Sequence, residues 1–291
     1  MFVRPLAAQR PVQQPGDSAV VINPNYLTAQ KLSLLLEIQL EDARNSPAQK
    51  SYHTPVTLRV MRKSTSGTQL EWLAGAGSRE GTGGQDPVFD MAEKIFADLR
   101  LQVQLDPAGK YLGLRNEEEL KGRIQEFLDT LVPQTVAKIP DVASRAKASE
   151  GIRAALAPPV LLSAARKELD LFFGISGLRM EPGKPVHVKS GLLNPFGVTG
   201  TLDGEMQIVA DPIDKARNEV RVAFSQEYDP QKALNFSSGK PADAAQQMSM
   251  EDHGEFLLDA SNWQVRQVRH VRTIRQNKTA VRTETTVIRV Q

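Results

Sequence analysis

The chain has 291 residues, of which 40% are hydrophobic and 24% are charged, and its formal net charge is +2. This composition is typical of a globular protein with enough apolar material for one large core or two smaller ones, and the small net charge does not mark the whole molecule as a polyanion binder. The sequence has no cysteine, which excludes disulfides, thiolate metal sites and cysteine nucleophiles, and it has no run of roughly 18 apolar residues that would predict a membrane span.

The first 24 residues carry four prolines and repeated glutamine, so we expect a flexible, unpacked tail over residues 1–24 and a single α+β domain over residues 25–291. Leu6–Gln9 is similar to the small-residue end of a secretory signal, but no apolar segment precedes it. Two interpretations stay open. The chain is a trimmed or mis-started exported protein, or it has a disordered cytoplasmic N-terminus.

The apolar residues of 32–40 favour a strand, although the spacing of Leu32, Leu35, Leu36 and Gln39 also fits a helix. Clearer alternation predicts a hairpin over 55–75 that turns at Thr65-Ser66-Gly67. The glycine-rich segment 75–85 lacks the Gly-Lys-Ser/Thr ending of a phosphate loop, so we expect a surface loop there. A short helix over 88–96 follows.

The stretch Asp98–Leu131 has the clearest pattern in the chain. Leu99, Leu101, Val103 and Leu105 alternate with polar residues and predict a strand, which a turn at 106–109 joins to a short strand at 111–114. Asn116 is the expected N-cap of a helix that runs to Leu131. Further helices are expected over 142–156 and 160–173, so a helical segment occupies about 117–174.

The second half of the chain returns to strand patterns. We expect a long polar surface loop over 235–252 and a β-bulge near Val265–Val268, where the alternation breaks. The strands are expected over 186–188, 198–209, 218–228, 255–258, 262–275 and 279–290. Because strands outnumber helices and most are joined as hairpins, the sequence predicts an α+β fold. Its curved, mostly antiparallel β-sheet would carry a central group of helices packed on one face.

Two turn-containing segments, Val103–Asn116 and Met180–Leu193, resemble those of a family of uncharacterised exported bacterial proteins and lipoproteins. That family has repeated β-hairpins and a strand–turn–helix unit. It also has a glycine followed five residues later by an aspartate before the terminal hairpin, and Gly254–Asp259 matches this pattern here. The chain departs from the family in lacking a lipobox cysteine, and in having Leu192 or Leu193 where a tryptophan often stands. The resemblance implies a periplasmic or secreted location, with cytoplasmic as the alternative, and it implies no activity.

Candidate catalytic groups are few. The four histidines, at 53, 187, 253 and 270, have no metal-ligand spacing, so we expect no metal and no other cofactor. Glu251-Asp252-His253 is an acid–histidine cluster, and Asp203 and Glu205 are paired carboxylates around Gly204. Ser176 is one residue out of the Gly-x-Ser-x-Gly frame, and a turn after a helix explains its neighbouring glycines better. We therefore predict no catalytic residue.

Basic residues crowd the terminal hairpin and are called the basic stripe below. The basic stripe consists of Arg266, Arg269, Arg272, Arg275, Lys278, Arg282 and Arg289. Such residues could contact phosphates, but Trp263 is the lone aromatic nearby, and acids such as Glu117, Glu118 and Glu119 could neutralise them. Val268, Val271 and Ile274 are spaced three residues apart, a spacing that no regular strand keeps on one face. We therefore predict that part of the basic stripe lies on the inner face of the sheet.

The favoured hypothesis is a non-enzymatic exported protein that binds an apolar or amphipathic ligand, or a partner protein, between sheet and helices. The ligand would be lipid-like or a small anion, and an envelope protein is the candidate partner. Arg266, Arg272 and Trp263 are the predicted ligand-binding residues, with Arg266 or Arg272 at the mouth of the cavity. One alternative is a nucleic-acid-associated protein that uses the basic stripe, although nucleic acid is the less favoured partner. The other alternative is a hydrolase that uses Asp203, Glu205 or His253.

Overall fold

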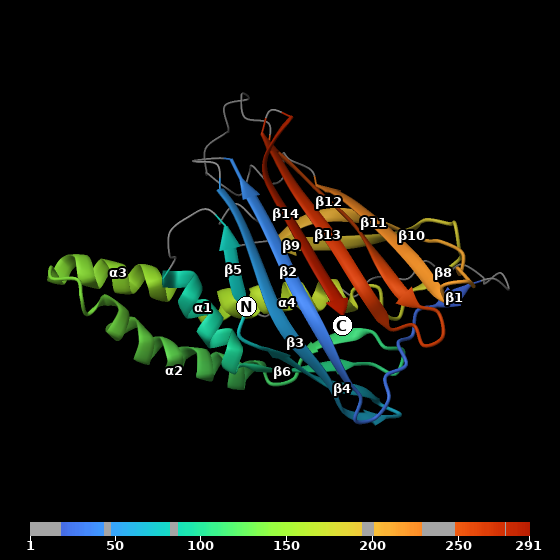
Figure 1. The fold of residues 1–291 in the computed structure, drawn as a ribbon, viewed down its shortest axis with the longest axis horizontal. Helices are drawn as coiled ribbons and strands as arrows, with labels where there is room; N and C mark the ends of the chain where they lie inside the picture. Colours follow the sequence, from blue (N-terminus) through green and yellow to red (C-terminus); the bar gives the residue numbers. More distant parts are fainter. Residues whose placement is uncertain (1–18, 44–47, 82–86, 194–200, 229–247, 277) are drawn as a thin grey trace. The chain divides into compact units, whose positions relative to one another are not determined.

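The computed structural model describes residues 19–43, 48–81, 87–193, 201–228, 248–276 and 278–291 (Figure 1). The chain forms two compact units. Unit 1 consists of Met1–Ile22, Gln39–Gln49 and Leu178–Thr286, and unit 2 consists of Asn23–Ile38, Lys50–Gly177 and Val287–Gln291. Both contain antiparallel β-structure, and the helices α1 to α4 belong to unit 2, so the predicted α+β class is confirmed in its broad form.

The sheet of unit 2 contains the predicted strand over 32–40 and the predicted hairpin over 55–75. Its hydrogen-bonded order is β7 (Tyr111–Leu114), β6 (Arg100–Leu105), β4 (Gly67–Ala74), β3 (Ala48–Ser64) and β2 (Lys31–Asp42). Leu34, Leu36, Leu58, Val60, Leu70 and Trp72 are buried at alternating positions, as strands with one face on a core require.

The glycine-rich segment is not entirely the loop that we expected. Ser78–Gly81 forms β5 and pairs with Lys50–His53 of β3, whereas 82–85 lies outside the described residues. The pairing of β3 with β4 ends at Val56 and Ala74, so β5 supplies partners for backbone groups of β3 that β4 does not reach.

The strand–turn–strand–helix unit at 98–131 is confirmed, with two corrections. The side chain of Asn116 makes no cap hydrogen bond. It accepts a hydrogen bond from Gln102 N (3.0 Å) and donates one to Arg100 O (2.9 Å), and so extends the ladder of β6. Helix α2 (Glu117–Val136) also continues through Pro133, because its buried stripe extends beyond Leu131 to Val132 and Val136 and offsets the lost hydrogen bond.

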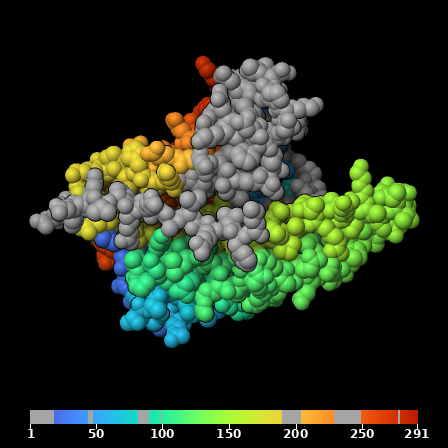
Figure 2. Space-filling model, turned by 180° about the vertical axis from the view of Figure 1, so that it is seen from behind, coloured from blue at the N-terminus to red at the C-terminus, as the bar shows by residue number. Residues whose placement is uncertain are grey.

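The other helices of unit 2 lie close to their predicted bounds. They are α1 (Pro87–Asp98), α3 (Val142–Ala155) and α4 (Pro158–Phe173). Helix α4 packs on the sheet through aromatic contacts, with Phe172 edge-on to Trp72 at 5.7 Å and Phe173 stacked on Tyr111 at 6.0 Å. Helix α3 has no buried residue, and it stands at the surface beside α2 (Figure 2).

Unit 1 contains a series of antiparallel strands. Its order is β14 (Thr279–Val290), β13 (Val265–Gln276), β12 (Met248–Asp259), β11 (Glu219–Tyr228), β10 (Thr201–Ala210) and β9 (Val186–Leu193). Residues 248–252, which we expected inside a loop, belong to β12, and 229–247 lie outside the described residues. Ser249, Glu251 and Asp252 are polar and favoured a loop, yet Asp252 is buried and pairs with Arg272. Composition alone therefore concealed the strand.

The start of the chain contributes one short strand to unit 1. Residues 1–18 of the expected tail lie outside the described residues. Val20–Val21 forms β1, which pairs with β8 (Arg179–Met180), and Ile22 is buried.

The predicted bulge in β13 is confirmed. Leu257 pairs with Gln267 and Leu258 with Val265, which leaves Arg266 as the extra residue. Beyond the bulge, Val268, His270, Arg272 and Ile274 share a buried face, so part of the basic stripe points inward as the three-residue step predicted.

Candidate functional site

Unit 2 contains a cavity of about 280 Å³ between its sheet and two of its helices, called the unit 2 cavity below. The lining comes from β2, β3, β4, β5, β6, α1 and α4 and from the segment between β4 and β5. Most of its wall is apolar and includes Leu36, Ile38, Trp72, Phe96, Leu99 and Leu101. A concave, largely apolar space with a few polar groups is the usual form of a small-molecule site.

Glycines at two positions shape the wall of this cavity. Gly75 N donates to Pro55 O (2.7 Å), and Gly77 N donates to Glu93 Oε1 (2.9 Å), which ties the end of β4 to α1. A Cβ added at Gly77 would lie 2.9 Å from Glu93 Oε1 and 3.0 Å from Thr54 Oγ1. The glycine-rich segment therefore serves close packing at the cavity wall.

The polar side chains around the cavity come from β3, β5, α1 and α4. Tyr52 and Thr54 line it, while His53 alternates to the opposite face, where it meets Glu37 at 3.2 Å. Arg79 pairs in register with Tyr52, and its guanidinium lies 5.9 Å from the centre of that ring.

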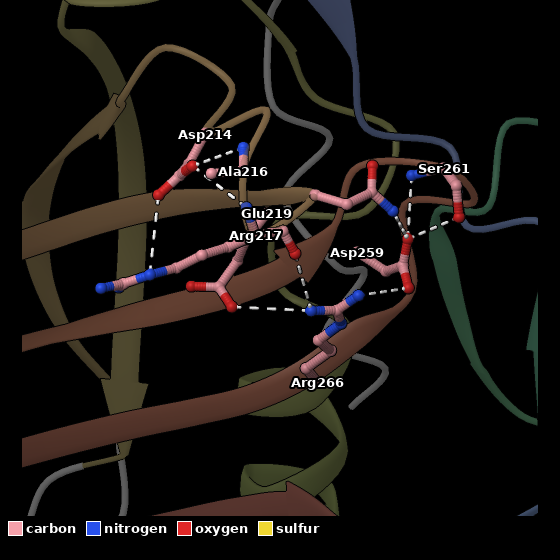
Figure 3. Close-up of polar contacts among 8 residues, drawn as sticks. Asp214, Ala216, Arg217, Glu219, Asp259, Ser261 and Arg266 are labelled. Atoms are coloured by element: carbon pink, nitrogen blue, oxygen red, sulfur yellow. Dashed lines mark hydrogen bonds and ion pairs between the residues drawn. The ribbon is translucent and has the colours of Figure 1, made fainter.

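Two of the predicted ligand-binding residues lie in unit 1. Arg266 is the second residue of β13 (Figure 3), and Trp263 belongs to the turn between β12 and β13. Arg266 Nη2 is 2.7 Å from Asp259 Oδ2, and Nη1 is 3.7 Å from Glu219 Oε2. Hydrogen bonds from Ser261 and from Arg266 lower the pKa of Asp259 to about 2. Trp263 is half-buried with φ of 60°, and its N donates to Asp259 O (2.7 Å).

Arg272, the third predicted residue, is buried in unit 1 among groups that we call the buried ion cluster. The cluster consists of Asp252, Arg272, His270 and Tyr228, which are 4%, 7%, 6% and 5% exposed. Arg272 donates to both oxygens of Asp252 at 2.9 Å. Asp252 Oδ2 also accepts from Tyr228 Oη (3.2 Å) and lies 3.3 Å from His270 Nε2. Burial acts to raise the pKa of Asp252, but the hydrogen bonds from Arg272 and His270 outweigh it and hold that pKa well below its usual range.

The rest of the basic stripe is largely paired with neighbours in its own sheet. Arg275 meets Glu251 at 2.5 Å, Arg282 meets Glu284 at 3.5 Å, and in unit 2 Arg289 meets Glu37 at 3.1 Å. In the part of the chain that the structure describes, no ion pair joins the basic stripe to its expected partners Glu117, Glu118 and Glu119. Glu117 pairs with Arg166 and Lys121, and Glu118 pairs with Lys121, because residues on one or adjacent helices lie closer.

The candidate hydrolase residues are separated by the strand geometry. Asp252 and His253 point to opposite faces of β12, so Asp252 is buried and His253 is exposed. Glu205 on β10 meets His187 of β9 at 2.8 Å. The side chain of Asp203 lies outside the described residues. Within the described ranges, no three His, Asp or Glu residues are grouped closely enough to hold a metal ion.

Sequence reasoning missed the residues of the unit 2 cavity as a site. Alternation placed Leu36, Leu99 and Leu101 on one face of their strands, and the glycines at 75 and 77 marked an interruption. The contributions of α1 and α4 come from distant parts of the chain. Among the residues that can be described, no helix is long and apolar enough to cross a membrane.

Comparisons with known proteins bear on the fold. No family model matches the chain, and no curated protein matches it. A structure of lipovitellin, described as showing lipid–protein interactions, is similar over 92% of this chain, with a TM-score of 0.50 and 9% identity. The chain spans 25% of the length of that lipovitellin chain.

Two other solved structures have lower scores, which carry no argument. DynF from the dynemicin biosynthesis pathway of Micromonospora chersina has a TM-score of 0.21 and 8% identity, over 97% of this chain and 92% of that chain. A domain described as that of an outer membrane lipoprotein-sorting protein from Vibrio parahaemolyticus has a TM-score of 0.18 and 10% identity, over 90% and 83%.

Proposed function

We propose that this chain is a non-enzymatic protein that binds one lipid-like molecule with its apolar chain in the unit 2 cavity. The single observation that carries the proposal is the cavity itself, about 280 Å³ of space lined mainly by apolar side chains. Protein interiors are normally close-packed, and apolar cavities of roughly 150 Å³ already bind small hydrocarbons. Each methylene that leaves water for such a site contributes about 0.8 kcal/mol, so a medium-length alkyl chain supplies useful affinity.

The likeness to lipovitellin supports a lipid-like ligand over other apolar molecules. That protein is described as showing lipid–protein interactions, and the shared fold extends over 92% of this chain. The resemblance of two turn segments to exported bacterial proteins supports a periplasmic or secreted location as part of the same proposal. An envelope protein that delivers or receives the lipid is the partner that this location would require.

Titration calorimetry with dodecanol tests the proposal, because this probe has an apolar chain and an uncharged end. Ala92 on α1 lines the cavity and is half-buried, so Ala92→Leu adds volume inside the space that the chain would occupy. We expect the wild-type protein to bind dodecanol and Ala92→Leu to bind it about tenfold more weakly, a loss of roughly 1.4 kcal/mol.

Ala154→Leu is the matched control, since Ala154 is exposed on α3 and lies outside the cavity lining. It should bind dodecanol like the wild type. Equal dodecanol affinity in the wild type and Ala92→Leu, or no binding by the wild type, would contradict the proposal.

A further inference from the structure

Two large apolar side chains of unit 2 are exposed on adjacent segments of backbone, and we call them the apolar tip below. Leu27, in the turn before β2, is 62% exposed, and Met61, near the end of β3, is 57% exposed. Val60, which precedes Met61, donates through its N to Gln30 O at 2.8 Å and holds the two segments side by side. Both segments lie at the same end of the unit 2 strands (Figure 1). The apolar tip is therefore one surface feature, although its two residues are distant in the chain.

The backbone conformation fixes the exposure of both side chains. Leu27 begins a closed turn, because Leu27 N donates to Gln30 Oε1 (2.9 Å) and Gln30 N donates to Leu27 O (3.0 Å). Within this turn Ala29 has φ of 62°. Met61 is the extra residue of a β-bulge, since the register of β3 on β4 shifts after Val60. Each side chain thus lies outside the alternation that buries Val60.

Basic side chains flank the apolar tip. Lys31 follows the turn, Arg62 and Lys63 follow the bulge, and all three are exposed. Lys63 Nζ donates to Asn25 Oδ1 (2.7 Å) and to Tyr26 O (3.0 Å), which are uncharged acceptors. In the part of the chain that the structure describes, no ion pair includes any of these three bases. Their positive charge is therefore available to an anionic partner.

An acid at the same end does not reverse this charge. Asp106 lies beside the β3–β4 turn, where a Cβ added at Gly67 would be 3.1 Å from the carbonyl carbon of Asp106. Its Oδ1 accepts from Ala108 N (2.8 Å) and from Lys110 N (2.9 Å) within its own turn. Lys110 is exposed and belongs to the same turn, so it offsets the carboxylate. The surroundings of the apolar tip keep an excess of positive charge.

Exposed apolar side chains rimmed by bases match a bilayer that contains acidic lipids. The head groups of such a bilayer offer phosphates to bases, and the region below them accepts apolar side chains. Nucleic acid would use the bases but leave the apolar tip in water.

We propose that unit 2 docks on an anionic membrane surface, with Leu27 and Met61 among the head groups. In this arrangement Lys31, Arg62 and Lys63 contact the lipid phosphates. None of these five residues lines the unit 2 cavity, so the inference concerns a separate surface and does not depend on the proposed function.

Vesicle flotation with the full chain tests the inference. The probes are vesicles of phosphatidylcholine alone and vesicles of phosphatidylcholine mixed with an equal amount of phosphatidylglycerol, at neutral pH and low salt. We expect the wild type to bind the mixed vesicles at least about tenfold more tightly than the phosphatidylcholine vesicles. Added salt should weaken this binding, because it shortens the Debye length.

Two double variants separate the apolar contribution from the basic one. Leu27→Ser/Met61→Ser should bind the mixed vesicles about tenfold more weakly than the wild type, because less apolar surface leaves water. Lys31→Gln/Arg62→Gln should lose a similar amount, and its remaining binding should depend less on salt. All four side chains are exposed, so thermal denaturation should give both variants a melting temperature close to that of the wild type.

Matched variants on and beside α3 show whether the position of the change matters. Val142→Ser removes an apolar side chain that is 74% exposed, and Lys138→Gln/Lys147→Gln removes two exposed bases. Both variants should bind the mixed vesicles like the wild type. Ala92→Leu, which adds volume inside the unit 2 cavity, should also keep vesicle binding.

Three results would overturn the inference, and none of them bears on the proposed function, which dodecanol binding tests. Failure of the wild type to bind the mixed vesicles would exclude docking. Equal losses in Val142→Ser and Leu27→Ser/Met61→Ser would show that the apolar tip has no special part in it. Wild-type vesicle binding by Leu27→Ser/Met61→Ser would also overturn it, and loss of a dimer in light scattering would then assign the apolar tip to contact between two copies of the chain.

Discussion

The two units treat buried space in opposite ways. In unit 1, Asp252 and Arg272 are buried, and their charges are joined by two hydrogen bonds of 2.9 Å. In unit 2, buried apolar side chains leave a cavity of about 280 Å³, and the carboxylates of Glu93 and Glu168 occur in its wall. In unit 1 the buried charges are therefore paired within the protein, whereas unit 2 leaves largely apolar space of a size that a small ligand fills.

For the same reason, the loss of an interaction lowers the free energy of unfolding by different amounts in the two regions. A buried charge that loses its partner keeps its desolvation penalty and gains nothing from water. An apolar wall that loses a few contacts forfeits only dispersion and transfer energy. Variants should therefore affect stability most in the buried ion cluster and affect binding most at the unit 2 cavity.

The largest effect is expected from Arg272→Met, which leaves Asp252 buried without its guanidinium partner. Chemical denaturation should show a loss of about 3–5 kcal/mol in the free energy of unfolding. The double variant Asp252→Leu/Arg272→Met should lose less than the single one, because no unpaired charge remains. Arg153→Met removes an exposed pair with Asp129 and should lose under about 1 kcal/mol. Equal losses in Arg272→Met and Arg153→Met would show that the cluster is not tightly coupled.

A smaller loss is expected from Gly77→Ala at the wall of the unit 2 cavity. The added Cβ meets Glu93 Oε1 and Thr54 Oγ1, so we expect about 1–3 kcal/mol of destabilisation from overpacking, together with weaker dodecanol binding. Gly122→Ala on α2 is the control, because a Cβ there meets nothing within 4 Å. It should gain up to about 1 kcal/mol from helix propensity. If Gly77→Ala unfolds with the same free energy as the wild type, the side chains of the cavity wall shift to admit the Cβ, which would contradict the predicted overpacking.

Variants of Asn116 test whether its side chain caps helix α2 or joins the helix start to the backbone of β6. Because its side chain both accepts from Gln102 N and donates to Arg100 O, Asn116→Ala should cost about 1–2 kcal/mol in thermal or chemical denaturation. Asn116→Asp is the sharper variant. Aspartate caps helices as well as asparagine does, but it cannot donate to Arg100 O. A wild-type stability for Asn116→Asp would support capping instead.

The smallest effect concerns Asp259, whose pKa is lowered to about 2 by Ser261 and Arg266. A depressed carboxyl pKa contributes stability above its unfolded value near 3.9, and this contribution is lost as the pH falls toward 2. The side chain is partly exposed, so solvent screening limits the effect, and Asp259→Asn should lose under about 1 kcal/mol at neutral pH. Unfolding measured from pH 7 to pH 2 should show the variant and wild type converging. A gap that stays constant over this range would exclude the ionised pair as its source.

Regular elements were predictable where one face of the element is buried. Alternation located β2, β4, β6 and β14, and the break in alternation located the bulge at Arg266. Other features depend on partners that the local sequence does not reveal. Strand β5 exists because β3 offers an edge. Met248–Asp252 belongs to a strand although it includes Ser249, Glu251 and Asp252, because it pairs in register with β13 and Arg272 pairs with Asp252.

The sequence predicted the type of the candidate site but not the residues that form it. The pattern of strands and helices predicted an apolar space between a sheet and helices, and unit 2 has one. Its residues could not be predicted, because Phe96, Leu101 and Ala165 are brought together by packing across long stretches of chain. The inward position of Arg272 followed from residue spacing, whereas its partner depends on strand register, which is set by tertiary structure.

The most direct test of the account uses the two tryptophans of the chain, one in each unit. Trp72 lines the unit 2 cavity, and Trp263 lies at the turn beside Arg266 in unit 1. Bromine quenches tryptophan fluorescence on contact, so dodecanol brominated on its chain reports which tryptophan it meets. We expect strong quenching in Trp263→Phe, which retains Trp72, and little quenching in Trp72→Phe. Quenching of Trp263 with Trp72 unaffected would contradict the account and place the ligand in unit 1.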